Sequence, residues 1–439
     1  MRGRLRDPAD REIARLAIPA FGALIAEPVY VLTDTAIVGH LGTPQLGGLA
    51  VASSVLLTLH AMFIVLAYGT TASVSRLLGA GHGREAALVA VQSLWLAAGV
   101  GVALAAVGYP LSGALVDLVG AEGTVRANAL VYLRISLVGV PPILVMLAGT
   151  GYLRGVKDTR TPLAVAVGTA LVNLGLEVVL IYGFDQGIGA SALATVVAQV
   201  GGAAVYLRLV LGAARRLGTP RRPDPHRLRE LARVGRDLLV RTAALRTALV
   251  VTTAVATRIG PVDVAAHQVA FEIWGFLGLA LDAIAIAGQT LVGHALGAGD
   301  AEGARAAGRR MIELGVAAGV MAGAAVALAR PWLPHLFSDD PEVVALAGFL
   351  LLWVAGLQPV NAVAFVLDGV LIGAGDMRFL AWAMAGAAAV FVPAALAVLA
   401  TGAGIGWLWA ALGLLMATRA GSLLARFAGD RWVVLGAVR

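Results

Sequence analysis

Twelve apolar stretches, each roughly 20 residues long, limit what this chain can fold into. Hydrophobic residues make up 59% of the sequence and charged residues only 13%, about half the charged share of an ordinary soluble protein. So few charges cannot cover a water-exposed surface, and a bilayer must therefore solvate most of the apolar side chains. This composition excludes a cytosolic enzyme and a DNA-binding module. We expect an all-α membrane protein with twelve transmembrane helices. The stretches lie near residues 16–38, 47–75, 87–109, 127–149, 161–183, 187–211, 238–257, 265–292, 311–329, 345–372, 380–400 and 403–425.

The basic residues predict the orientation of these spans. Most of the 33 Arg and Lys residues fall in the N-terminus, the C-terminus and the loops between even and odd spans. Only Arg126, Arg258 and Arg330 fall in the opposite loops. The positive-inside rule therefore places both termini in the cytoplasm of a multi-pass plasma-membrane protein. The charged start, residues 1–16, opens directly into a full-length span, so we interpret it as a retained cytoplasmic segment rather than a signal peptide.

An internal repeat relates the two halves of the sequence. At one shift of 218 residues, several motifs align without gaps. The aligned pairs are 40–52 with 258–270, 78–86 with 296–304, 155–160 with 373–378, Pro141 with Pro359, and Gly151 with Gly369. One shift that holds over so long a region predicts two homologous halves.

The repeat predicts the domain organisation. We expect a six-helix lobe over 1–211, an Arg-rich cytoplasmic linker over 212–237 that faces anionic lipid, and a second six-helix lobe over 238–439. Six is an even number of spans, so both halves enter the membrane from the same face. Parallel repeats of this kind are typical of transporters, whose sites lie near the interface of the halves.

Polar residues inside the spans are the candidates for function, because an ionisable group near the bilayer centre is costly. The first span carries Glu27 and Asp34, seven residues apart on one face. The fifth carries Asn173 and Glu177 at i and i+4, and the sixth carries Thr195. Two carboxylates with an amide and a hydroxyl suit a shared proton or a small hard cation such as Na⁺. We expect Asp34, Asn173, Glu177 and Thr195 to form an ion or proton site.

The second half does not repeat these residues. At the same shift, Glu27 aligns with Leu245, Asp34 with Thr252, Asn173 with Phe391, and Glu177 with Ala395. A purely structural need would have produced symmetric residues, so the asymmetry favours a coupling role.

Other intramembrane charges have more than one interpretation. Arg246 and Asp282 are predicted to pair with each other, as a structural or gating ion pair rather than a substrate site. Arg241 and Asp368 lie near cytoplasmic ends and are expected to reach the interface. His60 is either a proton carrier or a hydrogen-bonded core histidine.

Several kinds of chemistry have no motif in this sequence. Cys is absent, and the sequence contains no Walker A, H-E-x-x-H or G-x-S-x-G motif. We therefore expect no enzyme, no cofactor, no nucleic-acid partner and no metal beyond Na⁺. The energy for transport would then come from an ion gradient.

At this point the residues resemble a known family. IPAFGALIAEPVYVLTDTAIVGHLG (18–42), the LGAG turns at 78–81 and 296–299, YLRGVKDTR (152–160) and the segment 265–293 together resemble the multidrug and toxic compound extrusion (MATE) transporters of the DinF-like branch. The resemblance covers nearly the whole chain.

This resemblance implies two six-helix lobes in a V around a central cavity, and export of cationic or amphipathic compounds against H⁺ or Na⁺ influx. It assigns the cation or proton site to Asp34, with Asn173, Glu177 and Thr195 as partners, and a helix-bending role to Pro19. The sequence departs from the family at Glu177, where Asp is expected.

The leading hypothesis is thus a monomeric multidrug antiporter for small cationic or amphipathic molecules. One alternative is a flippase for a lipid-linked precursor of the same superfamily, which would more often have fourteen spans and a strongly basic cavity. An intramembrane enzyme is the alternative from another class, and the carboxylates lack the accompanying His motif that it would need.

Overall fold

The computed structural model describes residues 8–184 and 186–437, and these are almost entirely helical. Residues 1–7 of the charged N-terminal start lie outside this described part. No β-strand occurs among the described residues. The helices are α1 (Pro8–Gly39), α2 (Thr43–Phe63), α3 (Val65–Gly79), α4 (Gly83–Leu118), α5 (Gly123–Val138), α6 (Val140–Gly155), α7 (Arg160–Glu177), the π-helix η2 (Val178–Gly183), α8 (Ile188–Arg216), α9 (Pro225–Ile259), α10 (Pro261–Gly297), α11 (Ala301–Ala329), the 3₁₀ helix η3 (Leu333–Leu336), α12 (Pro341–Gly373), α13 (Met377–Thr401) and α14 (Ile405–Ala428).

The predicted spans correspond to helices of the structure. Eleven helices of the described chain are long and apolar enough to cross a membrane, and one bent pair raises the number to twelve. Each predicted stretch lies within one of these, to within two residues at its start, so the span positions are confirmed. The fourth span is not one straight helix. Its two parts, α5 and α6, meet at Gly139 with a bend of 48° between them. Pro141 and Pro142 lack the N–H groups that would continue α5, so a new helix begins there.

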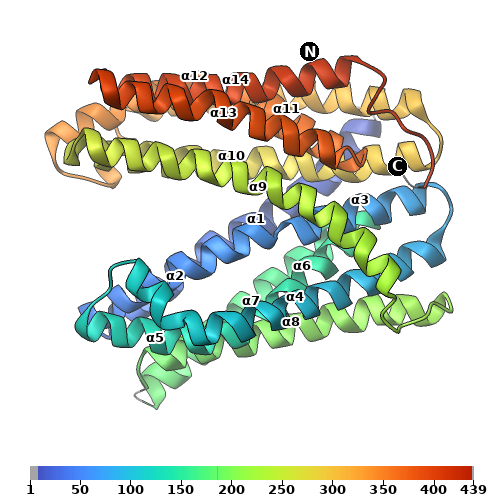
Figure 1. Cartoon of the computed structure of the whole chain (residues 1–439), viewed down its shortest axis with the longest axis horizontal. Helices are drawn as coiled ribbons and strands as arrows, with labels where there is room; N and C mark the ends of the chain where they lie inside the picture. Colours follow the sequence, from blue (N-terminus) through green and yellow to red (C-terminus); the bar gives the residue numbers. More distant parts are fainter. Residues whose placement is uncertain (1–7, 185, 438–439) are drawn as a thin grey trace. The chain divides into compact units, whose positions relative to one another are not determined.

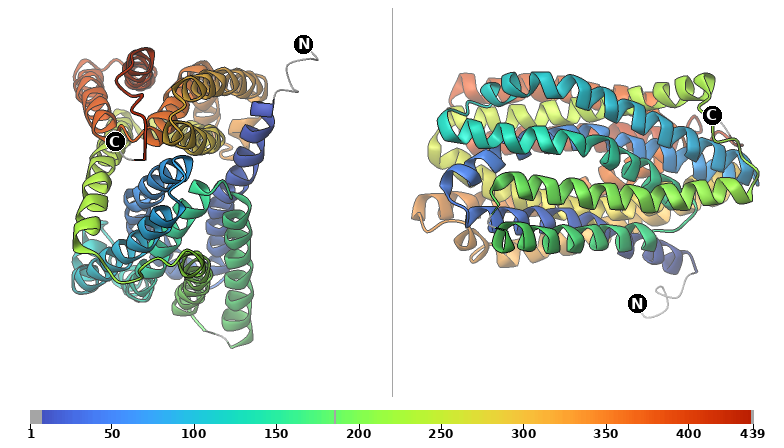
Figure 2. Two further views of the ribbon diagram at one scale, coloured as in Figure 1. Left: turned by 90° about the vertical axis from the view of Figure 1, so that its right-hand side faces the viewer. Right: turned by 90° about the horizontal axis from the view of Figure 1, so that it is seen from below.

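The chain forms two compact units (Figure 1). The N-terminal unit contains Ile18–Gly235, and the C-terminal unit contains Arg236–Arg439 together with Met1–Ala17. The sequence predicts one lobe over 1–211, whereas the structure groups Met1–Ala17 with the other half of the chain. Both α1 and α9 therefore contribute residues to each unit. Within each unit the helices lie side by side as a bundle (Figure 2).

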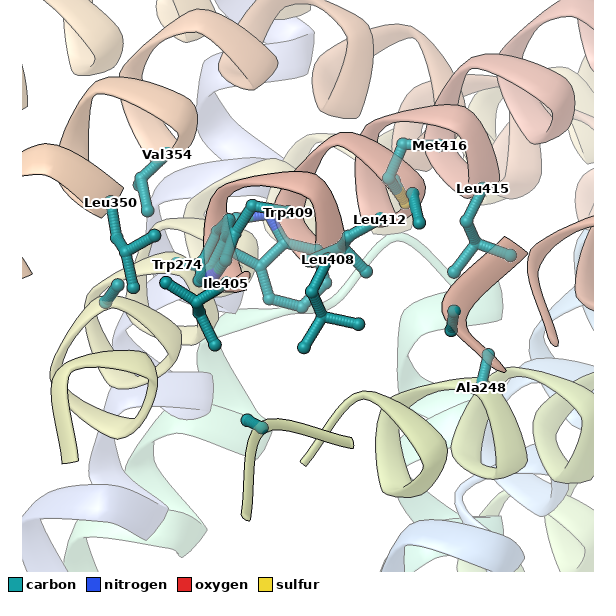
Figure 3. Packing of buried hydrophobic residues seen from close by; sticks show 14 of the residues in the cluster. Ala248, Trp274, Leu350, Val354, Ile405, Leu408, Trp409, Leu412, Leu415 and Met416 are labelled. Carbon is teal, nitrogen blue, oxygen red and sulfur yellow. The ribbon is translucent and has the colours of Figure 1, made fainter. Parts of the chain in front are cut away.

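Each unit has its own apolar core. In the N-terminal unit Leu94, Leu133, Leu144 and Val210 pack together from α4, α5, α6 and α8. The core of the C-terminal unit includes Trp274 of α10, Leu350 of α12, and Leu408 and Trp409 of α14 (Figure 3). Because lipid is as apolar as these side chains, close van der Waals packing rather than exclusion from water holds such helices together.

One close backbone contact occurs in both units at the same repeat position. A Cβ on Gly151 of α6 would lie 2.5 Å from the carbonyl oxygen of Ala67 on α3. A Cβ on Gly369 of α12 would lie 2.3 Å from the carbonyl oxygen of Ala285 on α10. Ala67 and Ala285 are related by the same shift of 218 residues as the two glycines. The repeat found in the sequence therefore extends to helix–helix contacts, which only glycine permits here.

We predict that Gly151→Ala and Gly369→Ala each destabilise the protein by about 1–3 kcal/mol, the usual cost of overpacking a tight contact. The matched control is Gly168→Ala in α7, where an added Cβ meets nothing within 4 Å. Size-exclusion chromatography of heated, detergent-solubilised protein checks this. Equal melting temperatures for Gly168→Ala and the two tight-contact variants would contradict the packing argument.

Candidate functional site

Asp34 on α1 is held by hydroxyl groups from two other helices. Its side chain is buried, with the residue only 5% exposed. The Tyr132 hydroxyl of α5 donates to Oδ2 of Asp34 at 3.3 Å, and Oγ of Ser191 on α8 lies 2.6 Å from Oδ1. Hydroxyl donors of this kind stabilise an ionised carboxylate away from water.

Glu177 lies at the end of α7 and contacts the same serine. It is fully buried, and its Oε1 lies 2.9 Å from Oγ of Ser191. The π-helix η2 begins at the next residue, Val178. Such wide turns occur frequently at functional sites. The two acids, from different helices, thus meet at one hydroxyl.

Counting protons shows what this arrangement requires. A serine hydroxyl has one hydrogen to donate, yet Ser191 contacts two carboxyl groups. If it donates fully to one carboxylate, the other acid makes a hydrogen bond to Oγ only when it carries a proton of its own. The 2.6 Å contact to Asp34 has the length of a charge-assisted bond, and the 2.9 Å contact to Glu177 does not. The geometry therefore fits a protonated Glu177 beside Asp34.

Thr195 connects the other polar side chains to this pair. Its hydroxyl donates to the carbonyl oxygen of Ser191 at 3.0 Å. It lies 3.1 Å from Nδ2 of Asn173 and 2.8 Å from the hydroxyl of Tyr30. Since Thr195 has already used its one hydrogen, Asn173 and Tyr30 are the donors to it.

A cavity of about 310 Å³ within the N-terminal unit lies against this network. Tyr30, Asp34, Tyr132, Asn173 and Thr195 line part of its wall. Most of the rest of the wall is apolar and would accommodate the body of an organic molecule.

The structure brings four of the predicted site residues together. Asp34, Asn173, Glu177 and Thr195 form one hydrogen-bonded network through Ser191. Glu27 also lines the cavity, with its Oε1 3.5 Å from Nε2 of His60. Pro19 lies inside α1, two residues after the last residue of that helix assigned to the C-terminal unit.

The predicted ion pair belongs to the C-terminal unit. Arg246 is exposed on α9 and Asp282 is half-buried on α10. Their pairing stays a prediction.

Arg241 and Asp368 do not reach toward an interface as the sequence suggested. Both are buried, and they pair with each other through Nε of Arg241 and Oδ1 of Asp368 at 3.0 Å. Arg419, also buried, lies 3.2 Å from Oδ2 of the same carboxylate. Buried charges are generally paired, and the carboxylate of Asp368 is paired here with two guanidinium groups.

Sequence reasoning missed Tyr30, Tyr132 and Ser191. Ser191 precedes Thr195 by four residues and shares its helix face, a spacing that could have flagged it. A hydroxyl inside a span costs little, however, because it can bond to its own helix backbone. Tyr132 has no such local signal, since only the packing of α5 brings it to Asp34.

The equivalent region of the C-terminal unit is apolar. Asn173 aligns with Phe391, Glu177 with Ala395, and Tyr132 with Leu350, all of which are wholly buried in the core of that unit. Figure 3 labels Leu350 together with Trp409, which aligns with Ser191 at the shift of 218, and Leu408, the residue before it. The same place in the repeat thus holds a polar network in one unit and an apolar core in the other.

Comparison with known proteins gives matches over most of the chain. A family model described as MatE matches residues 19–179 and 240–398. "Protein DETOXIFICATION 44, chloroplastic" of Arabidopsis thaliana is 34% identical over 391 residues, which cover 85% of this chain and 74% of that protein. "DNA damage-inducible protein F" of Escherichia coli (strain K12) is 29% identical over 429 residues, 95% of this chain and 92% of that protein.

Solved structures share the fold. A MOP superfamily transporter from Pyrococcus furiosus superposes with a TM-score of 0.86 at 22% identity, covering 97% of each chain. The Vibrio cholerae MATE transporter VcmN in its bent form superposes with a TM-score of 0.87 at 20% identity, covering 95% of this chain and 96% of that one. The predicted all-α, MATE-like fold is confirmed.

We predict that the protein in Na⁺-free buffer near neutral pH retains one protonated buried carboxyl group, because Ser191 cannot donate to both acids. Its carbonyl stretch should appear in the infrared spectrum and persist after exchange into D₂O. The band should disappear in Glu177→Gln and remain in Glu85→Gln, which changes an exposed acid. An unchanged band in Glu177→Gln would assign the proton elsewhere.

Proposed function

The chain belongs to the MatE family of multidrug efflux transporters, and on that premise we propose that it is a secondary active antiporter. It exports cationic or amphipathic compounds across the plasma membrane in exchange for H⁺ or Na⁺. Both termini lie in the cytoplasm, the side on which the basic residues gather. The protein acts as a monomer within the bilayer.

The observation that carries this proposal is the contact of Asp34 and Glu177 with the one hydroxyl of Ser191. Two carboxyl groups so placed hold one proton between them and exchange it as a unit. Loss of that proton leaves two neighbouring negative charges in a low-dielectric setting, which is unfavourable unless a cation replaces it. The pair therefore binds a monovalent cation reversibly.

Na⁺ is compatible with the same side chains, because hard cations prefer oxygen ligands. Oε2 of Glu177 is buried and has no hydrogen-bond partner among the described residues. Nδ2 of Asn173 is engaged by Thr195, so its Oδ1 remains for a cation. Asp34, Asn173, Glu177 and Thr195 would thus hold the ion. No group of three or more His, Asp or Glu side chains suited to another metal occurs in the described part of the chain.

The transport cycle follows from ion binding at this pair. In the outward-facing protein an ion binds at Asp34 and Glu177, α1 bends at Pro19, and the cavity beside Asp34 contracts. A compound in that cavity is then expelled. Pro19 suits this role, because it leaves the carbonyl of Arg15 without its helical donor and so weakens α1 at that point.

We predict that Asp34→Asn abolishes efflux of a fluorescent cationic drug from proteoliposomes, because the amide can neither bind a proton nor hold a cation charge. Glu302→Gln, which changes an exposed acid in the first turn of α11, should retain efflux. Wild-type rates in Asp34→Asn, with equal protein in the vesicles, would refute the antiport proposal.

The coupling ion can be identified with imposed gradients. A proton gradient and a sodium gradient are applied separately to vesicles that contain the wild-type protein. One of them should drive drug accumulation, and Glu177→Gln should abolish that response. Transport in the absence of both gradients would contradict secondary coupling.

We also predict that Pro19→Ala slows gradient-driven efflux while drug binding is retained, because alanine restores the helical N–H and stiffens α1. Binding and transport are measured on the same preparation. Wild-type efflux would mean that α1 does not bend at this residue.

A further inference from the structure

A second pair of titratable side chains lines the cavity of the N-terminal unit. Nε2 of His60 on α2 lies 3.5 Å from Oε1 of Glu27 on α1. Both residues belong to the wall of the cavity of about 310 Å³. Glu27 precedes Asp34 by seven residues, so the two acids lie two turns apart on one face of α1. Glu27 takes no part in the network around Ser191 and needs an explanation of its own.

The two acids of α1 differ in how accessible their charge is. Asp34 is buried, and hydroxyl groups occupy both of its oxygens. The side chain of Glu27 is 48% exposed, and His60 is its one ion-pair partner among the described residues. Both acids line the cavity, and a molecule in it therefore reaches the charge of Glu27 more readily than that of Asp34.

His60 is placed to control this charge. Its side chain is 19% exposed, and its Nδ1 is buried with no hydrogen-bond partner in the described chain. Neutral imidazole offers Glu27 at most a hydrogen bond, whereas imidazolium offers it a full positive charge. A protonated His60 therefore competes with any other cation for Glu27.

The surroundings of the pair favour an organic cation as the ligand. The wall near these residues is apolar and includes Leu24, Leu56, Leu57, Ile143, Met146 and Leu147. The other titratable or charged side chains in the wall are Tyr30 and Asp34 on α1, Tyr132 on α5, Arg154 on α6 and Tyr206 on α8, and α4 contributes none. One accessible carboxylate in an apolar wall suits a molecule with a hydrophobic body and a single positive charge.

We infer that Glu27 and His60 form a substrate-recognition site separate from the ion-coupling site, in which Glu27 holds the positive charge of an amphipathic substrate and His60 displaces it when protonated. This inference rests on the proposed function and adds the recognition residues to it. Substrate binds when His60 is neutral, on the less acidic side of the membrane. Acidification of the cavity on the opposite side protonates His60, which takes the Glu27 carboxylate and releases the substrate.

Equilibrium dialysis of tetraphenylphosphonium against the full-length protein in detergent tests this. The probe has no titratable group, so any pH dependence comes from the protein. Between about pH 8 and about pH 5.5, which brackets imidazole protonation, wild-type affinity should fall roughly tenfold, the equivalent of one ion pair. His60→Gln should keep the high-pH affinity throughout. Glu27→Gln should bind weakly at every pH, and Glu27→Asp should recover part of the affinity.

Tetraphenylborate, which has the same shape and the opposite charge, is the control ligand. Glu27→Gln should not weaken its binding, whereas a loss for both ligands would mean that the variant merely distorts the cavity and would overturn the inference. Unchanged tetraphenylphosphonium affinity in Glu27→Gln, or full pH dependence in His60→Gln, would also overturn it. In either case loss of efflux in Asp34→Asn would leave the antiport proposal standing, and only wild-type efflux in Asp34→Asn would remove both.

Discussion

The single hydrogen of the Ser191 hydroxyl is the constraint on which the site depends. With Asp34 and Glu177 both in contact with Oγ, one acid must be protonated or a cation must take the proton's place. Two ionised carboxylates in contact with the same hydroxyl would repel each other, and this repulsion is stronger in a buried, low-dielectric setting than in water. Such repulsion would act between α1, which carries Asp34, and α7, which carries Glu177. In the proposed transport cycle, ion occupancy and the position of α1 are linked in this way.

The sequence predicted the acids of this site but not the hydroxyl that joins them. Asp34 and Glu177 stand out because a charge inside a span is costly and because the repeat partner lacks both. Ser191 and Tyr132 carry no comparable penalty, so nothing in the span pattern separates them from helix-packing residues. Their importance depends on which helices meet, and twelve apolar stretches alone do not specify that.

The same distinction holds for the fold. Span positions follow from hydropathy, and the repeat follows from glycines such as Gly151 and Gly369 that meet backbone in both units. The bend at Gly139 and the π-helix after Glu177 are local departures that prolines and polar residues permit but do not determine. Arg241 and Asp368 show what the sequence cannot decide. A charged residue near the end of a span can either reach the membrane interface or lie buried beside a partner of opposite charge. Only the packing of α14, which brings Arg419 to the same carboxylate, decides for burial.

Helix α1 connects these features. Near its start, Asp10 receives two hydrogen bonds of 2.7 Å from Arg310 of α11, which fixes this end within the C-terminal unit. Beyond the boundary between the units come Pro19 and Pro28, and then Asp34, the acid proposed to bind the coupling ion. Each proline leaves one carbonyl of the preceding turn without its helical donor, so the helix is weakest between its anchor and its ion site. A helix that is held at one end and pushed at the other bends most easily at its prolines. The sequence order of Asp10, Pro19 and Asp34 therefore suits α1 to convert ion binding into movement.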